Sequence, residues 1–148
     1  MSAKSIIIAG GGLTGALAAL MLARDGHRVS LYERRGDIRD AKIVHGRSIN
    51  LAISTRGLTA LERVGLRQEV LDMSVPMRGR RMHGKDNSTT FQPYSANEDE
   101  NIYSISRGGL NRFLIEQAAA EENVTLFFQH RCMGVDPRSG VVTFIDDE

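Results

Sequence analysis

The glycine-rich segment near the N-terminus limits the possible folds of this chain more than any other feature. Residues 6–8 are three isoleucines, which is typical of a parallel strand covered on both faces. Positions 10–15 then read Gly-Gly-Gly-Leu-Thr-Gly, and the Ala- and Leu-rich residues 16–24 predict a helix. Residues 29–33 alternate as a second strand that ends in Glu33. This order predicts a β–α–β unit suited to the diphosphate and ribose of a dinucleotide.

Each glycine of this turn has its own physical role. Gly10 permits the tight turn, and Gly12 lets the main chain approach a phosphate with no Cβ in the way. Gly15 lets the helix lie close to the strand. The start of the helix presents free N–H groups and the positive end of its dipole to the anion. Glu33 is expected to accept hydrogen bonds from a ribose diol, and its charge would oppose a 2′-phosphate.

Two other interpretations account for the same residues. The glycines could serve packing alone in a β–α–β unit that binds nothing. Lys4, followed by a long stretch without charge, also fits a signal peptide, but three glycines in a row and the immediate second strand argue against one. Ser5 and Thr14 interrupt the stretch in a way that disfavours a membrane span.

Composition narrows the classes of protein further. A chain of 148 residues, 41% hydrophobic and 25% charged, is the size and type of one ordinary globular domain. A net charge of +1 gives no general attraction to nucleic acid or to membranes, so neither is an expected partner. The single cysteine, Cys132, excludes an internal disulfide and favours a reducing compartment, and hence the cytoplasm. Four scattered histidines predict no metal site.

The rest of the chain reads as alternating helices and strands. We expect a short strand or turn at 49–53, helices at 55–64, 66–73 and 107–122, and strands at 77–83, 91–94, 102–105, 124–128, 133–135 and 141–145. Residues 77–94 form a predicted hairpin, residues 85–101 include a long exposed connection, and the strand at 124–128 is expected to join the first two in parallel. The pattern predicts the α/β class.

The arginines of one predicted loop and a single arginine at a predicted helix start each allow two interpretations. The loop at 34–39 is either a solvated turn or places Arg34 or Arg35 beside an adenine or a phosphate. Arg107 lies in the first turn of a predicted helix, where the dipole disfavours a cation. It is therefore either simply tolerated there or holds an anionic or polar ligand.

The predicted hairpin carries the candidate substrate residues. Arg78 and Arg80 fall on one face of its first strand. They are either rim residues or a fork for a substrate carboxylate, which a planar guanidinium binds better than lysine does. Tyr94 on the return strand could pack within the hairpin or against a small aromatic ligand.

Several separated motifs together resemble one family. The matching segments are Gly10-Gly11-Gly12-Leu13-x-Gly15, Tyr32-Glu33-x-Arg35, Gly46-Arg47-Ser48-Ile49-Asn50-Leu51-Ala52, Ala60-Leu61-x-x-Val64-Gly65-Leu66, Pro76-Met77-Arg78-x-Arg80, Pro93-Tyr94 and Ser104-Ile105-Ser106-Arg107-x-x-Leu110-Asn111. They resemble the N-terminal part of the kynurenine 3-monooxygenase family, within the aromatic hydroxylases that use FAD and NAD(P)H. The segment at 46–52 is the most specific of these, and the resemblance covers nearly the whole chain.

The resemblance implies roles for particular residues. Around the ADP half of FAD it implies Gly10, Gly12, Leu13, Thr14, Gly15, Glu33, Arg34 and Arg35, with backbone contacts from Cys132 near the adenine. It implies Ala52 near the isoalloxazine and Arg107 near the diphosphate or ribityl chain, and it assigns Arg80 and Tyr94 to the kynurenine carboxylate. That favours Arg80 over Arg78. It gives no catalytic acid or base. Gly108-Gly109 and Cys132 depart from the family pattern.

The resemblance also implies a fold and an activity. The fold is a Rossmann-like FAD-binding β–α–β unit with the first strands of an interleaved substrate sheet. Residues 1–75 and 102–148 would belong to an incomplete FAD-binding domain, and residues 76–101 to the start of the substrate sheet. The implied reaction is hydroxylation of L-kynurenine to 3-hydroxykynurenine with NADPH and O₂. Since family members are roughly three times longer, we expect no turnover from these residues alone.

Three alternative functions stay open at this point. The chain could come from another FAD-dependent aromatic hydroxylase, in which Arg80 and Tyr94 would lose their purpose. It could be an NAD-binding Rossmann domain, because Glu33 suits either ribose, or a non-catalytic nucleotide-binding module. A homodimer and a membrane anchor in a longer product are also left open by the sequence.

Overall fold

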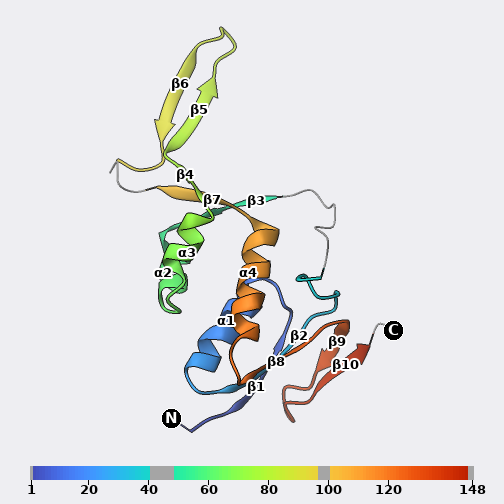
Figure 1. Ribbon diagram of the computed structural model, residues 1–148. Coiled ribbons are helices and arrows are strands. Elements are labelled where there is room, and N and C mark those ends of the chain that lie inside the picture. The colour runs from blue at the N-terminus through green and yellow to red at the C-terminus, as the bar shows by residue number, and fades with distance from the viewer. Residues whose placement is uncertain (1, 41–48, 97–100, 147–148) are drawn as a thin grey trace. The chain divides into compact units, whose positions relative to one another are not determined.

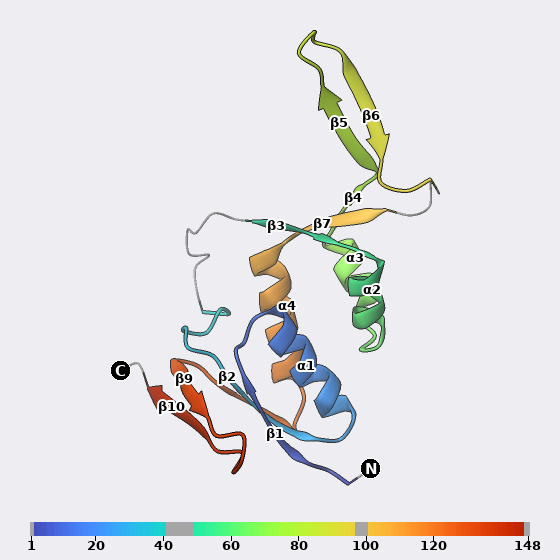
Figure 2. The ribbon, with the colours of Figure 1, turned by 180° about the vertical axis from the view of Figure 1, so that it is seen from behind.

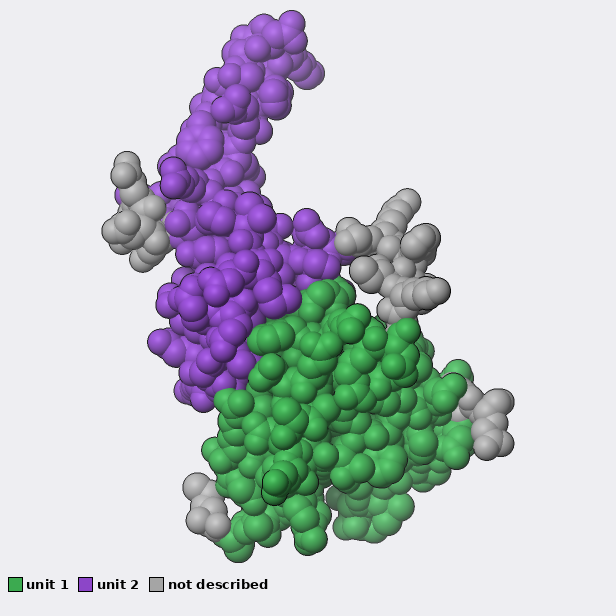
Figure 3. Space-filling view, viewed as in Figure 1, with its two compact units in different colours: residues 1–46, 108–148 green, residues 47–107 purple. Residues whose placement is uncertain are grey.

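The computed structural model describes residues 2–40, 49–96 and 101–146 of the chain. They divide into two compact units, distinguished in Figure 3: Met1–Gly46 with Gly108–Glu148, and Arg47–Arg107. We call them unit 1 and unit 2. The boundaries of these units differ from the predicted division into residues 1–75 with 102–148 and residues 76–101. That division was a functional one, and it stays a prediction.

Unit 1 is built on a three-stranded parallel sheet. Its strands are β1 (Ser5–Ala9), β2 (Arg28–Tyr32) and β8 (Val124–Phe127), in the order β1-β2-β8. The central strand carries the most deeply buried side chains, with Val29 2% and Leu31 0% exposed. The predicted third parallel strand is therefore confirmed, and the α/β class with it.

Two helices cover one face of this sheet. The chain moves in the same direction from β1 to β2 and from β2 to β8, so right-handed crossovers place both helices on the same side. These helices are α1 (Leu13–Arg24) and α4 (Arg107–Ala119), which Figures 1 and 2 label in opposite views. Their buried residues form the core of the unit: Ala16, Ala19, Leu20 and Ala23 of α1, and Leu110, Leu114, Ile115 and Ala118 of α4.

The boundaries of these helices correct the sequence prediction. α1 begins at Leu13, three residues before the predicted start, so Thr14 and Gly15 lie in its first turn. It ends where expected, because Gly26 adopts the left-handed conformation (φ +83°) that favours glycine. α4 ends at Ala119 instead of residue 122.

A separate hairpin completes unit 1. The strands β9 (His130–Val135) and β10 (Val142–Asp146) pair antiparallel as predicted, although β9 begins three residues earlier. Their register shifts between Thr143 and Phe144, which is a β-bulge. Bulges bend a strand and increase its twist, so this one sets the direction in which the start of β9 runs.

Unit 2 combines an antiparallel sheet, two helices and a second hairpin. The sheet has the order β3-β7-β4, and the elements are β3 (Asn50–Ile53), α2 (Thr55–Glu62), α3 (Arg67–Asp72), β4 (Val75–Met77), β5 (Gly79–His83), β6 (Thr89–Pro93) and β7 (Ile102–Ser106). The stretch predicted as one strand at 77–83 is divided at Arg78, because β4 pairs with β7 while β5 pairs with β6. No helix in the part of the chain that the structure describes is long and apolar enough to cross a membrane.

Candidate functional site

The turn after β1 requires glycine at two positions, Gly10 for its backbone conformation and Gly15 for lack of space. Gly10 has φ +113°, and its N–H donates to the carbonyl oxygen of Tyr32 over 2.7 Å, which joins the turn to the end of β2. A Cβ on Gly15 would lie 1.9 Å from the carbonyl oxygen of Gly10. No side chain fits there, because the obstacle is main chain. The first turn of α1 therefore packs directly against the glycine turn.

Gly12 needs no special conformation, and its importance lies in the space beside it. It precedes α1 in an extended conformation (φ −73°, ψ −178°), and a Cβ built on it would meet nothing within 4 Å. Gly12 gives no side-chain cap to the helix, so it leaves the first N–H groups of α1 for another acceptor. Open space in front of uncapped N–H groups at a helix start is the arrangement that binds phosphate.

Glu33 presents a buried carboxylate one residue beyond β2. The residue is 7% exposed, and its Oε2 accepts a hydrogen bond from the N–H of Gly11 at 2.8 Å. Its Oε1 accepts from the N–H of Arg35 at 3.0 Å and from Nε of Arg35 at 2.8 Å. Burial alone would raise the pKa of this carboxyl, but the hydrogen bonds from Arg35 and Gly11 outweigh burial and lower the pKa below its ordinary value.

The arginines of the following loop have different surroundings. Arg35 forms an ion pair with Glu33, which raises the pKa of the guanidinium, and Arg39 is paired with Asp37. Arg34 lines an open hollow beside the glycine turn. The two candidates that the sequence left open are therefore separated: Arg34 faces the site, and Arg35 holds the carboxylate of Glu33 in place.

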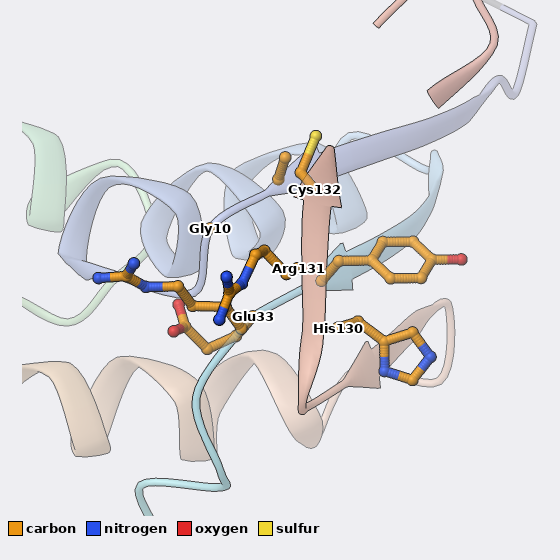
Figure 4. Close-up of a pocket in the computed structure, with 8 residues that line it drawn as sticks. Gly10, Glu33, His130, Arg131 and Cys132 are labelled. Atoms are coloured by element: carbon orange, nitrogen blue, oxygen red, sulfur yellow. The ribbon is translucent and has the colours of Figure 1, made fainter. Parts of the chain in front are cut away.

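Unit 1 contains an open hollow of about 350 Å³. Its lining comes from three segments: Ala9, Gly10, Tyr32, Glu33, Arg34, His130, Arg131 and Cys132. Figure 4 shows the labelled residues arriving from the turn after β1, from the end of β2 and from β9. The volume lies within the range of about 300–1,000 Å³ that is usual for ligand pockets.

The start of β9 forms the third wall of this hollow. The N–H of His130 donates to the carbonyl oxygen of Glu33 at 3.0 Å, and the N–H of Gln129 donates to that of Arg35 at 3.1 Å. Gln129 adopts the left-handed conformation (φ 62°) at this turn. Tyr32, His130 and Arg131 belong to the site, but sequence reasoning gave them no role, since only the return of β9 to the end of β2 brings them there.

Two other predicted cofactor residues lie in unit 2. Ala52 pairs with Ser104 across β3 and β7, and the N–H of Arg107 donates to the carbonyl oxygen of Ile49 at 3.3 Å. Their predicted contacts with a flavin remain predictions. The segment 46–48, which opens the most specific motif, lies outside the described residues.

The predicted substrate residues lie on the β5–β6 hairpin. Arg80 is opposite Gln92 in the ladder, and its Nε donates to Oε1 of Gln92 at 2.8 Å. The N–H of Tyr94 donates to the carbonyl oxygen of Arg78 at 3.0 Å, which continues the same pairing. Arg78, Arg80 and Tyr94 therefore share one face of the hairpin, and all three residues are exposed. Gln92 is a partner of Arg80 that sequence reasoning missed, because it depends on the register of the hairpin.

The geometry of unit 1 fits the ADP half of a dinucleotide. The open space at Gly12 and the uncapped start of α1 suit a diphosphate, and the carboxylate of Glu33 keeps acceptor capacity for a ribose diol. The hollow beside β9 has room for the base. Among the described residues, no group of three His, Cys, Asp or Glu side chains is placed to hold a metal ion.

Comparison with known proteins identifies the dinucleotide as FAD. A family model described as FAD binding domain matches residues 3–145. The kynurenine 3-monooxygenase of Myxococcus xanthus (strain DK1622) is 46% identical over 97% of this chain, and that of Caenorhabditis elegans is 49% identical over 89%. The alignments cover 31% and 29% of those proteins, so the chain spans about a third of the length of the curated relatives it matches.

Solved structures share the fold. The p-nitrophenol 4-monooxygenase PnpA of Pseudomonas putida DLL-E4 superposes with a TM-score of 0.76 at 19% identity, over 95% of this chain and 36% of that one. PqsL of P. aeruginosa, in complex with 2-aminobenzoylacetate, gives a TM-score of 0.71 at 25% identity, over 95% of this chain and 37% of that one.

Proposed function

This chain belongs to the FAD-binding domain family, and from that premise we propose that it is the N-terminal, FAD-binding part of a kynurenine 3-monooxygenase. The observation that carries the proposal is the hollow in unit 1, which is lined by Gly10 and the buried Glu33 and lies at the turn that leads into the uncapped start of α1. The curated relatives at 42–49% identity are named kynurenine 3-monooxygenases, which points to hydroxylation of kynurenine. NADPH and O₂ are the co-substrates that the family resemblance implies.

In this proposal unit 1 binds the ADP half of FAD. The N–H groups at the start of α1, which include those of Leu13 and Thr14, hold the diphosphate, and Gly12 gives it room. Glu33 accepts hydrogen bonds from the ribose hydroxyls. The base lies against the start of β9, with Arg34 and the backbone at Cys132 beside it.

The chain's own residues bind and orient, and the cofactor carries the redox chemistry. When bound, FAD would accept reducing equivalents from NADPH and supply the O₂ chemistry that hydroxylates the aromatic ring. Glu33 acts through its charge, which its lowered pKa maintains at neutral pH. We assign no catalytic acid or base among these residues.

Unit 2 is proposed to contribute the first part of the substrate site. Arg80 carries a guanidinium on an exposed face of β5, and its Nε is already engaged by Gln92. That leaves the two terminal nitrogens to fork onto the carboxylate of kynurenine, with Tyr94 as the predicted partner. Ala52 and Arg107 keep their predicted roles near the flavin. A cytoplasmic location, inferred from the single cysteine, and a homodimer remain predictions.

Titration of FAD into the purified chain tests the first half of this proposal. We expect a flavin absorbance that stays with the protein and quenched flavin fluorescence, with ADP competing for the site. NAD⁺ should compete more weakly than ADP. A chain that binds NAD⁺ and not FAD would instead be an NAD-binding domain, and one that binds neither would contradict the proposal.

Kynurenine-stimulated NADPH oxidation tests the second half. The assay needs this segment joined to the remaining two thirds found in its relatives. We expect stimulation by L-kynurenine that Arg80→Ala abolishes and that Arg81→Ala, on the opposite face of β5, leaves in place. Stimulation by a different aromatic substrate, insensitive to Arg80→Ala, would assign the chain to another aromatic hydroxylase.

A further inference from the structure

β9 provides one wall of the hollow, and this strand belongs to a two-stranded sheet that is separate from the parallel sheet. β9 and β10 form no ladder with β1-β2-β8, and most of their side chains are exposed. Two backbone hydrogen bonds, at Gln129 and His130, fix the first end of β9. The placement of the wall therefore depends on how β10 is held against the parallel sheet.

A stack of three aromatic rings provides that attachment. The ring of Tyr32, at the end of β2, stacks on Phe127 of β8 with centroids 4.5 Å apart and planes 8° apart. The ring of Phe144, from β10, stacks on Tyr32 with a centroid separation of 3.9 Å and an interplanar angle of 17°. Parallel stacks of this kind stabilise beyond the area they bury. Phe144 thus joins β10 to the central strand β2 at Tyr32 and, through the ring of Tyr32, to Phe127 of β8.

The register of the hairpin connects this stack to the hollow. Phe144 is the ladder partner of Cys132, which lines the hollow, and it stands directly beside the bulge. Side chains opposite each other in a ladder share a face, so the position of Phe144 sets the position of the backbone at Cys132.

A polar clamp lies next to the stack. Nδ1 of His130 lies 2.7 Å from the carbonyl oxygen of Phe128, and Nε2 lies 2.9 Å from Oδ1 of Asp146, the ladder partner of His130. A neutral imidazole carries one N–H and can donate to one of these acceptors, whereas a protonated ring can donate to both. The clamp links the last described residue of β10 to the first residue of β9.

We propose that Phe144 is a positioning residue for nucleotide binding: stacked on Tyr32, it holds the β9 wall at the distance that the adenosine half of the dinucleotide needs. The side chain does not line the hollow itself. The inference rests on the proposed function, since it presumes that the hollow takes ADP or the ADP half of FAD.

The test compares the affinity for ADP and FAD in four variants by calorimetry, well below the unfolding temperature. Phe144→Leu keeps an apolar side chain and removes the stack, and we expect it to weaken both ligands by the same factor, about 3- to 10-fold. Phe144→Tyr keeps the ring and should restore wild-type affinity. Asp146→Ala, at an exposed position, should weaken ADP about 2- to 3-fold. Ile145→Val, on the opposite face of β10, should change neither.

The outcomes separate the two proposals. Wild-type affinity in a folded Phe144→Leu variant would overturn the inference and leave the FAD assignment intact, as would a loss of stability without any loss of affinity. If Phe144→Leu does not fold, the other two variants decide. The inference is overturned if Asp146→Ala binds ADP as the wild type does and Phe144→Tyr binds it more weakly. A wild-type chain that binds neither ADP nor FAD overturns the proposed function and this inference together.

Discussion

The two candidate binding surfaces of this chain differ in how their residues are held. In unit 1, Glu33 is 7% exposed and held by hydrogen bonds from two residues, and Gly15 leaves no space for a Cβ beside the carbonyl of Gly10. In unit 2, Arg80 is exposed on a two-stranded hairpin and held by one side-chain hydrogen bond to Gln92.

The difference shows where binding geometry and folding are coupled. Most of the nucleotide site is formed by the same contacts that form the parallel sheet and α1, so changes at Gly15 or Glu33 should alter stability, whereas Gly12 faces open space and should affect binding alone. The hairpin residues contribute little to the fold, because a surface side chain away from caps and cores usually changes stability by less than about 0.5 kcal/mol. Four substitutions test this contrast.

Gly15→Ala should have the largest effect on stability. Its Cβ would lie 1.9 Å from a main-chain oxygen, so the glycine turn or α1 must move. We expect a loss of about 3 kcal/mol or more in the free energy of unfolding, or failure to fold, measured by urea unfolding followed by circular dichroism. Gly36→Ala, where a Cβ meets nothing within 4 Å, is the matched control and should stay close to wild type.

Glu33→Gln should have the next largest effect, and one that depends on pH. Removing the charge weakens the hydrogen bonds from Gly11 and Arg35, which predicts a loss of about 1–3 kcal/mol at pH 7. Folding lowers the pKa of Glu33, so its contribution is fully present above the unfolded pKa of about 4.3 and is lost as the pH falls through the folded value.

Urea unfolding at pH 7, 5 and 3 checks the sign of this effect. The difference in stability between wild type and Glu33→Gln should be steady from pH 7 to about pH 5 and shrink toward pH 3. A difference that grows toward acid would mean that burial, and not hydrogen bonding, dominates the pKa of Glu33.

Gly12→Ala should separate binding from folding within unit 1. Its Cβ enters open space, so the free energy of unfolding should change by less than about 0.5 kcal/mol. The same methyl group occupies the place expected for a phosphate. Because hydrogen bonds to a charged group contribute about 1.5–3 kcal/mol, FAD and ADP should bind about 10- to 100-fold more weakly. Unchanged affinity by calorimetry would place the diphosphate elsewhere.

Arg80→Ala should have the smallest effect on this chain. It removes one exposed hydrogen bond, so the stability should change by less than about 0.5 kcal/mol and the affinity for ADP should not change. Arg81→Ala serves as the control from the other face of β5. A marked loss of stability in Arg80→Ala alone would show that the hairpin is held more firmly than its exposure indicates.

Much of unit 1 could be predicted from local sequence. The isoleucines of β1, the alanines and leucines of α1 and the alternation of β2 each indicate their element within a few residues, and Gly26 marks the end of α1. The start of α1 was misplaced because Leu13 and Thr14 read as part of the turn, whereas packing of Gly15 against Gly10 extends the helix to them.

The sequence by itself determined the β–α–β unit, the glycine turn and the acid at the end of β2, because short-range periodicity and glycine's freedom specify them. Tertiary structure alone decided which arginine faces the hollow, that Gly11 and Arg35 hold Glu33, and that β9 closes the site with Phe144 behind it. The stacking of Phe144 on Tyr32 joins residues about a hundred positions apart, and the hydrogen bond from Gly11 to Glu33 joins the turn after β1 to the end of β2. Both contacts exist only once strand order and register are set. No local pattern encodes them.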